Sequence, residues 1–157
     1  MPITRIISGG QTGADQAGLA AAKELGLATG GWMPRGFRTD EGPRRDFLEF
    51  YQMIEHESSD YPPRTIMNVR YAGGTLIFGD SKSPGCRLTE KHAFESGRDI
   101  FWVGWHSGDP IPRVDIFKEW IAARDWDTLN VAGNRERINS GIFLACKTFL
   151  ITALKDQ

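Results

Sequence analysis

The 157-residue sequence contains no apolar run long enough to span a membrane, so we expect no membrane-spanning segment and no membrane partner. Its first ten residues, MPITRIISGG, lack the regions of a secretory signal, and we therefore expect a cytoplasmic protein. The formal net charge is only −1 with the two signs interleaved, which argues against a broad basic face for nucleic acid. Cys86 and Cys146 lie far apart without CxxC or Cys/His ligand spacing, and the histidines are scattered. We therefore expect two reduced thiols and no protein-bound metal.

Composition and patterning indicate a single α/β domain over residues 1–157. The hydrophobic fraction of 40% and the charged fraction of 25% are typical of a globular protein. Short β-branched apolar runs, typical of buried parallel strands, alternate with helical patterns. The predicted strands are Ile3–Ser8, Leu27–Trp32, Thr75–Phe78, Ile100–Val103 and Leu129–Val131. The alternation predicts a Rossmann-like three-layer α/β/α sandwich with a mostly parallel sheet of about five or more strands.

Helices are expected between these strands and after the last one. The predicted helices run from about Ala14 to Leu25, Asp60 to Tyr71, Gly85 to Gly97, Val114 to Ile121 and Ile142 to Ala153. The region from Pro34 to Asp60 is the least regular part. We interpret it as a long functional loop with one short helix or strand.

Ligands collect at the carboxyl ends of the strands in such a sheet, and three polar segments follow predicted strands there. The first is SGGQTGAD at Ser8–Asp15. Its glycines permit positive φ and close backbone approach, and the helix that follows offers free N–H groups. The segment favours a bound phosphate or other anion over a plain tight turn. Its candidate binding residues are Gly9, Gly10, Gln11, Thr12, Gly13 and Asp15.

Asp15 has two interpretations. An acid in the first turn of a helix is stabilising by roughly 0.3–1 kcal/mol, so capping is one role. The other is a carboxylate that faces the ligand, bound to a ribose or a metal-bound water or acting in catalysis. The sequence leaves both open.

The second segment follows the third predicted strand, at Asp80–Glu90. Ser83, Gly85 and Thr89 could form another anion site at a helix start, although Ser83 could also be a simple cap. Glu90 is a candidate general base, but a surface charge is the favoured interpretation.

The third segment, Asn130–Glu136, follows the fifth predicted strand. Asn130 can orient a ligand, Gly133 allows a turn, and Arg135 can pair bidentately with phosphate. The alternative is an ordinary strand–loop–helix junction. Three such junctions on one sheet edge together favour ligand binding more than any one does alone.

Two further features support this site. Arg64 and Asn68 share one face of their predicted helix. Trp32 and Arg35 follow the second strand, where they could border a base or pterin ring.

These motifs together resemble the molybdenum cofactor carrier proteins, the circularly permuted YpsA-like members of the SLOG superfamily. The resemblance runs through SGGQTGADQAGL at Ser8–Leu19, GWMPRGFRTDEGP at Gly31–Pro43, RTIMNV at Arg64–Val69, GTLIF at Gly74–Phe78, SPGCRLT at Ser83–Thr89 and LNVAGNRE at Leu129–Glu136. It implies a Rossmann-like fold in which Gly9, Gly10, Thr12 and Gly13 form the principal phosphate loop. Ser83, Gly85 and Thr89 would form a second wall, and Asn130, Gly133 and Arg135 would complete the pocket. Pro84, Arg87 and Asn134 depart from the usual family pattern, which raises the question of an altered ligand choice.

The resemblance also implies a function and partners. We expect a homo-oligomer, dimer or tetramer, that binds a phosphorylated small molecule, either molybdenum cofactor (molybdopterin-type) or a nucleotide, as a carrier or storage protein. The alternatives are a phosphoribohydrolase-like, nucleotide-processing enzyme and a nucleotide-sensing protein. Asp15 and Glu90 are the candidate catalytic carboxylates of such an enzyme. Its signature, PGGxGTxxE, is matched only faintly by Pro84, Gly85 and Glu90, which favours binding without catalysis.

Overall fold

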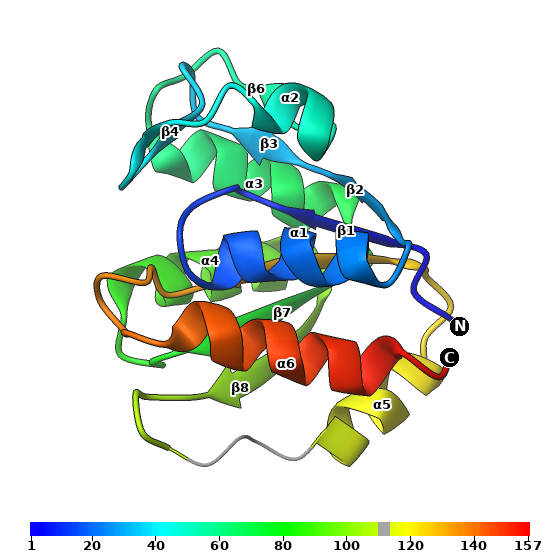
Figure 1. The fold of residues 1–157 in the computed structure, drawn as a ribbon. Helices are drawn as coiled ribbons and strands as arrows, with labels where there is room; N and C mark the ends of the chain where they lie inside the picture. Colours follow the sequence, from blue (N-terminus) through cyan, green and yellow to red (C-terminus); the bar gives the residue numbers. More distant parts are fainter. Residues whose placement is uncertain (110–113) are drawn as a thin grey trace.

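The computed structural model of the chain describes residues 1–109 and 114–157, and its centre is a five-stranded sheet (Figure 1). The strands are β1 (Arg5–Ser8), β2 (Ala28–Gly30), β7 (Gly74–Gly79), β8 (Asp99–Gly104) and β9 (Thr128–Gly133). Their order across the sheet is β2-β1-β9-β7-β8, and each neighbouring pair is parallel. The predicted parallel sheet is therefore confirmed.

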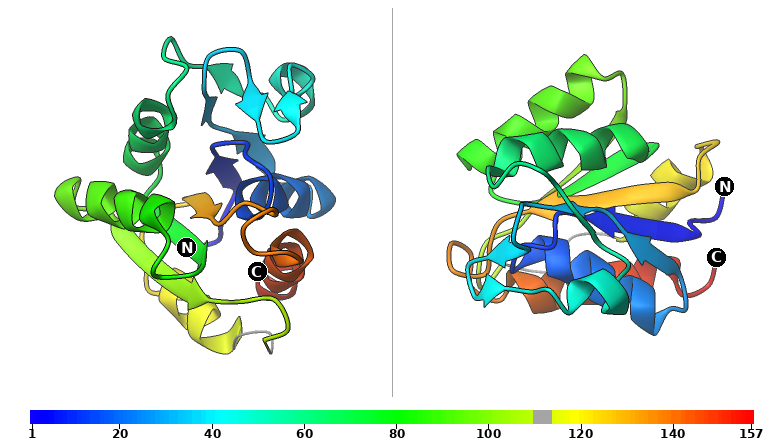
Figure 2. Two further views of the ribbon diagram at one scale, coloured as in Figure 1. Left: turned by 90° about the vertical axis from the view of Figure 1, so that its left-hand side faces the viewer. Right: turned by 90° about the horizontal axis from the view of Figure 1, so that it is seen from above.

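Helices cover both faces of the sheet, as the two views in Figure 2 show. On one face, α1 (Ala14–Glu24) contacts α6 (Ile142–Leu154), which in turn contacts α5 (Val114–Ala122). On the other face, α3 (Tyr61–Tyr71) contacts α4 (Pro84–Glu95). This confirms the predicted three-layer sandwich. No helix in the described part of the chain is both long and apolar enough to cross a membrane.

The main hydrophobic core lies between the sheet and the helices α1, α5 and α6. Phe78 of β7, Phe117 of α5 and Phe149 of α6 are fully buried, and the rings of Phe78 and Phe117 lie 5.6 Å and 5.2 Å from that of Phe149. Burial of one such side chain contributes about 1.5–3 kcal/mol. Helix α1 approaches the sheet closely, because a Cβ on Gly18 would already collide with Val131. The small residues of α1 thus let the helix, and with it the β1–α1 loop, lie close to the sheet.

The second predicted strand ends earlier than its apolar pattern suggests. Gly31 has φ 122°, and a Cβ there would overlap the carbonyl oxygen of Ser8. The chain turns at this glycine, so that β2 stays in the main sheet while β3 (Trp32–Met33) leaves it. Tight contact between the two backbones therefore divides what the sequence presents as one strand.

Residues 32–60 are more regular than the predicted loop with one short element. β3 pairs in parallel with β6 (Ile54–Glu55), and β4 (Arg38–Thr39) pairs with β5 (Gly42–Pro43) as a hairpin. The short helix α2 (Phe47–Phe50) lies between β5 and β6 in the chain. These elements have a small core of their own, made of Leu19, Met33, Phe37, Phe47, Tyr51 and Met53. Figure 1 shows this unit beside α3 at the upper end of the molecule. We refer to residues 32–60 as the upper unit.

The strand order creates a topological switch point at the carboxyl edge of the sheet. From β1 the chain passes through α1 to β2 on one side, whereas from β7 it passes through α4 to β8 on the other side. Because α1 and α4 lie on opposite faces, the connections diverge at this edge. Such a switch point is where α/β sheets bind ligands. The β1–α1, β7–α4 and β9–α6 connections all start there.

Candidate functional site

The β1–α1 loop is held in shape by hydrogen bonds to its own side chains. The Gly10 N–H donates to Ser8 Oγ (3.1 Å), the Gln11 N–H to Asp15 Oδ2 (3.2 Å) and the Thr12 N–H to Gln11 Oε1 (2.9 Å). The loop is therefore preorganised. A ligand that used these N–H groups would have to displace the acceptors that they already have.

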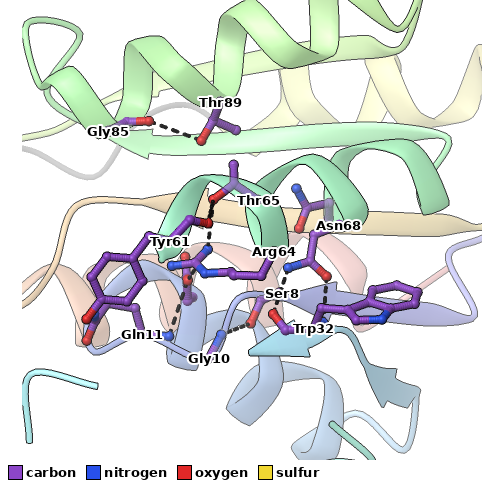
Figure 3. Close-up of polar contacts among 12 residues, drawn as sticks. Ser8, Gly10, Gln11, Trp32, Tyr61, Arg64, Thr65, Asn68, Gly85 and Thr89 are labelled. Atoms are coloured by element: carbon purple, nitrogen blue, oxygen red, sulfur yellow. Dashed lines mark hydrogen bonds and ion pairs between the residues drawn. The ribbon is translucent and has the colours of Figure 1, made fainter. Parts of the chain in front are cut away.

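Asp15 and Arg64 form a buried ion pair against this loop. Arg64 Nη1 lies 3.7 Å from Asp15 Oδ2, and the side chains are only 12% and 6% exposed. A Cβ on Gly9 would collide with the guanidinium group, so this glycine lets Arg64 lie directly on the backbone. Figure 3 shows Arg64 reaching from α3 to the loop beside Gly10 and Gln11. A cation from the opposite helix layer thus covers the predicted phosphate loop.

Burial is the largest influence on the pKa values of both residues in this pair. Removal from water raises the pKa of Asp15 to about 6, and the attraction of Arg64 and the loop hydrogen bonds offset only part of that effect. Burial also lowers the pKa of Arg64. Asp15 can therefore gain or lose a proton close to neutral pH, which an ordinary capping aspartate cannot do.

Three buried polar atoms beside the loop have no hydrogen-bond partner among the described residues: Gln11 Nε2, Thr12 Oγ1 and Arg64 Nε. A buried group left unsatisfied costs about 1–3 kcal/mol. Two of the three atoms can only donate, and the Thr12 hydroxyl can donate as well. Their position favours a ligand that supplies acceptor oxygens.

Tyr61, at the start of α3, lies among three arginines. The guanidinium carbons of Arg38, Arg135 and Arg64 lie 4.6, 4.9 and 5.3 Å from the centre of its ring. The ring faces attract cations, and the arginines come from three separate segments that the fold brings together. We call Arg38, Tyr61, Arg64 and Arg135 the arginine cluster.

The β9–α6 connection supplies the residues that join the loops. Arg135 belongs to the arginine cluster, and Asn130 lies in the sheet, where its Nδ2 donates to Thr75 Oγ1 of β7 at 3.2 Å. Gly133 is required by packing, because a Cβ there would overlap the carbonyl oxygen of Phe78. The Glu136 carboxylate accepts from the N–H groups of Gly141 (2.5 Å) and Phe143 (2.9 Å) at the start of α6, so its contacts are those of a cap.

Asn134, one of the departures from the family pattern, lies in the β9–α6 connection and bonds to residues of the other two connections. Its carbonyl oxygen accepts from the Ala14 N–H at 3.1 Å, and its side-chain Oδ1 accepts from the Asp80 N–H at 2.6 Å. Asn139, which sequence analysis missed, lies beside it with Nδ2 donating to the Trp105 carbonyl oxygen at 2.7 Å. Nothing in the local sequence around Asn139 distinguishes it from an ordinary loop residue.

The β7–α4 connection brings Ser83, Gly85 and Thr89 to the start of α4. Ser83 occupies the N-cap position, but its hydroxyl does not cap the helix. Thr89 Oγ1 donates to the Gly85 carbonyl oxygen at 3.1 Å, and Figure 3 shows both residues across from Thr65 of α3. A Cβ on Gly85 would approach only Ser83 Oγ, at 3.9 Å. Packing therefore gives no reason for glycine at position 85.

Three residues singled out in the sequence have contacts elsewhere. Asn68 Nδ2 donates to the Trp32 carbonyl oxygen (3.0 Å) and its Oδ1 accepts from the Trp32 N–H (2.8 Å), which joins α3 to β3. Arg35 borders a shallow surface hollow with Glu55, His56 and Glu57. Glu90 accepts a hydrogen bond from Trp102 Nε1 of β8 and lines a hollow with Arg87 and Phe94. The structure thus brings Asp15 to the loop but engages Glu90 at the β8 side of α4.

A third hollow, of about 420 Å³, opens beside Thr12 and Gly13 toward the start of α6. Glu41 and Glu136 line it, and they would repel an anion. The arginine cluster is consequently the better place for a negative group. Within residues 1–109 and 114–157, no three His, Cys, Asp or Glu side chains are grouped so that they could hold a metal ion.

Comparison with known proteins identifies the family. Residues 6–154 match the circularly permutated YpsA SLOG family. The fold is similar to the crystal structure of a protein named "putative molybdenum carrier protein" from Syntrophus aciditrophicus SB, with a TM-score of 0.83 and 32% sequence identity over 97% of this chain and 94% of that chain. No curated protein matches the sequence. The resemblance drawn from the motifs is confirmed, and the chain belongs to the circularly permuted YpsA group of the SLOG family.

Proposed function

We propose that the protein binds a phosphorylated small molecule at the carboxyl edge of the sheet, as a carrier or storage protein for a molybdopterin-type ligand or a nucleotide. The observation that carries the proposal is the arginine cluster beside buried polar atoms that have no partner in the part of the chain that the structure describes. Arg64 Nε and Gln11 Nε2 offer donors, and Arg135 adds a guanidinium group that can pair bidentately with phosphate. The name of the Syntrophus protein supports molybdenum cofactor as one candidate cargo.

The residues fit the phosphate end of such a cargo. Its oxygens would satisfy the donors that the described protein atoms leave without acceptors. The flanks of Tyr61, already lined by guanidinium groups, suit an anion better than a neutral group. These features apply equally to a pterin phosphate and to a nucleotide, so the proposal rests on the phosphate rather than on the ring.

Gly85 offers a second, independent support. Gly85 is the second residue of α4, and neither packing nor a positive φ requires glycine at this position. Close approach of a ligand to the start of α4 would explain the residue.

Binding to AMP, with adenosine as the uncharged comparison, tests the proposal by calorimetry. We expect AMP to bind and Arg135→Ala to weaken it at least about tenfold, since a hydrogen bond to a charged group contributes about 1.5–3 kcal/mol. Gly85→Ala should weaken AMP as well without loss of thermal stability, and Gly104→Ala, where a Cβ meets open space, is the matched control. Equal losses for AMP and adenosine in Arg135→Ala would show that Arg135 is structural. Native mass spectrometry of gently purified protein would identify a bound pterin or nucleotide directly.

A phosphoribohydrolase-like activity is the second candidate, and Asp15 is the observation that favours it. A carboxyl group with a pKa near 6 beside an arginine can exchange a proton at neutral pH, as general acid–base catalysis requires. Release of free adenine and ribose 5-phosphate from AMP, lost in Asp15→Asn, would support catalysis. Stoichiometric binding without these products supports the carrier.

A further inference from the structure

The tip of the β4–β5 hairpin places an acidic side chain on the arginine cluster. Asp40 Oδ1 lies 2.9 Å from Arg135 Nη1, and its Oδ2 lies 3.2 Å from Arg137 Nε. The carboxylate is 16% exposed, whereas Arg135 and Arg137 are 30% and 69% exposed. One carboxylate thus bridges two guanidinium groups at the mouth of the site, from a position 95 residues away from Arg135.

The same residue also touches the phosphate loop. The Asp40 N–H donates to Gln11 Oε1 at 2.8 Å, and this oxygen accepts from the Thr12 N–H too. Two N–H donors fix the orientation of the Gln11 carboxamide, since a flipped group would point an NH₂ at both of them. Gln11 Nε2, the other end of this carboxamide, is a buried donor with no acceptor among the described residues.

We propose that Asp40 is an internal stand-in for a ligand anion. On this view Arg135, which also contacts the first phosphate, forms a second anion subsite with Arg137 beside Arg64. The inference rests on the proposed function and specifies its ligand class as a molecule with two adjacent anionic groups, such as a diphosphate. The ligand's second anionic group displaces the Asp40 carboxylate, and the Asp40 side chain turns away from the two arginines.

The geometry makes this exchange favourable. Asp40 holds each arginine through a single oxygen, and Arg137 is largely in solvent, where ion pairs are weak. A phosphate has more acceptor oxygens and can engage an arginine bidentately. A ligand oxygen that reached Gln11 Nε2 would also give this donor the acceptor that it lacks among the described residues. The hairpin backbone can stay in place during this exchange, because the Thr39 hydroxyl donates to the Gly42 carbonyl oxygen at 2.7 Å and the Asp40 N–H donates to Gln11.

The test measures inorganic pyrophosphate and AMP binding to wild type and to Asp40→Asn by calorimetry at low salt. The variant keeps the Asp40 N–H bond to Gln11 but removes the competing charge. We expect it to bind pyrophosphate at least about tenfold more tightly than wild type, with a smaller gain for AMP. Arg137→Ala combined with Asp40→Asn should cancel most of that gain.

Asp46→Asn is the matched control, because it removes a carboxylate from the same upper unit, where Asp46 pairs with Arg44 at 2.9 Å. A gain of the same size in this control would show that net charge alone is responsible, and would overturn the inference. If both proteins bind AMP, but wild type and Asp40→Asn bind pyrophosphate with the same affinity, then Asp40 is not a stand-in for a ligand anion while the proposed function holds. If neither protein binds either probe, both fail together.

Discussion

The buried carboxyl of Asp15 makes the stability of the protein depend on pH in a direction opposite to that of most aspartates. Its ordinary pKa of 3.8 rises to about 6 on folding, because the side chain is only 6% exposed and burial outweighs the attraction of Arg64. Between these two values the native state keeps a proton that the unfolded chain has released. The contribution of Asp15 to stability is therefore greatest below about pH 4 and is lost as the pH rises through about 6.

The size of this effect follows from the shift. Roughly two pKa units correspond to about 3 kcal/mol in total, at 1.36 kcal/mol per unit. About 2 kcal/mol of that change falls between pH 4.5 and pH 7. Because the side chain is buried, little of the effect is screened by solvent. Asp15→Asn cannot ionise and should lack this dependence.

The assay is urea unfolding of wild type and Asp15→Asn at several pH values from 4.5 to 7.5. The difference between their unfolding free energies removes the contribution of every other titrating group. We expect wild type to lose about 2 kcal/mol relative to the variant across this range. Asp127→Asn gives the contrast, because hydrogen bonds from Thr4 and Thr128 lower the pKa of Asp127. The difference in unfolding free energy between wild type and Asp127→Asn should therefore not fall as the pH rises. A flat or rising curve for Asp15 would refute the argument that burial dominates at this site.

Two further predictions concern the residues that join the loops. Gly133→Ala should lower the unfolding free energy by roughly 2–4 kcal/mol, because its Cβ would overlap the Phe78 carbonyl oxygen. Gly104→Ala is the control, and it should change the unfolding free energy by less than about 0.5 kcal/mol in the same urea titration. Asn139→Ala should lower the unfolding free energy by about 1–3 kcal/mol, since it leaves the buried Trp105 carbonyl without its donor. Equal stability of either variant and wild type would contradict the contacts described for that position.

The sheet and its helices could be predicted because their signals are local. Five β-branched runs became the five strands, and Asp60 with the prolines after it marks the start of α3. The loops after β1, β7 and β9 could be placed on one edge because parallel strands end on the same side. The predicted fold needed only the alternation of elements and no knowledge of which strand lies beside which.

The upper unit could not be predicted in the same way. Its strands have only two residues each, too short for a pattern of alternation, and its small core includes Leu19 of α1, which belongs to another part of the chain. The division of the second strand depends on contact between Gly31 and Ser8, which no local pattern contains. For the same reason Arg38 and Asp40 could not be added to the site, although both lie in a motif that the sequence marked as characteristic.

The structure also separates two uses of glycine that the sequence cannot distinguish. Gly13 and Gly133 are needed by the fold, because a Cβ on either would collide with neighbouring backbone, whereas Gly85 has open space around it. A glycine-rich segment is therefore not by itself evidence of a ligand. Here the N–H groups of Gly10, Gln11 and Thr12 already have acceptors, so tight binding of an anion must draw mainly on the arginines and on the exchange of internal carboxylates for ligand oxygens. Asp40 holds each of its two arginines through a single oxygen, and Asp15 can be neutralised by a proton, which makes a site that holds two carboxylates compatible with a negatively charged ligand.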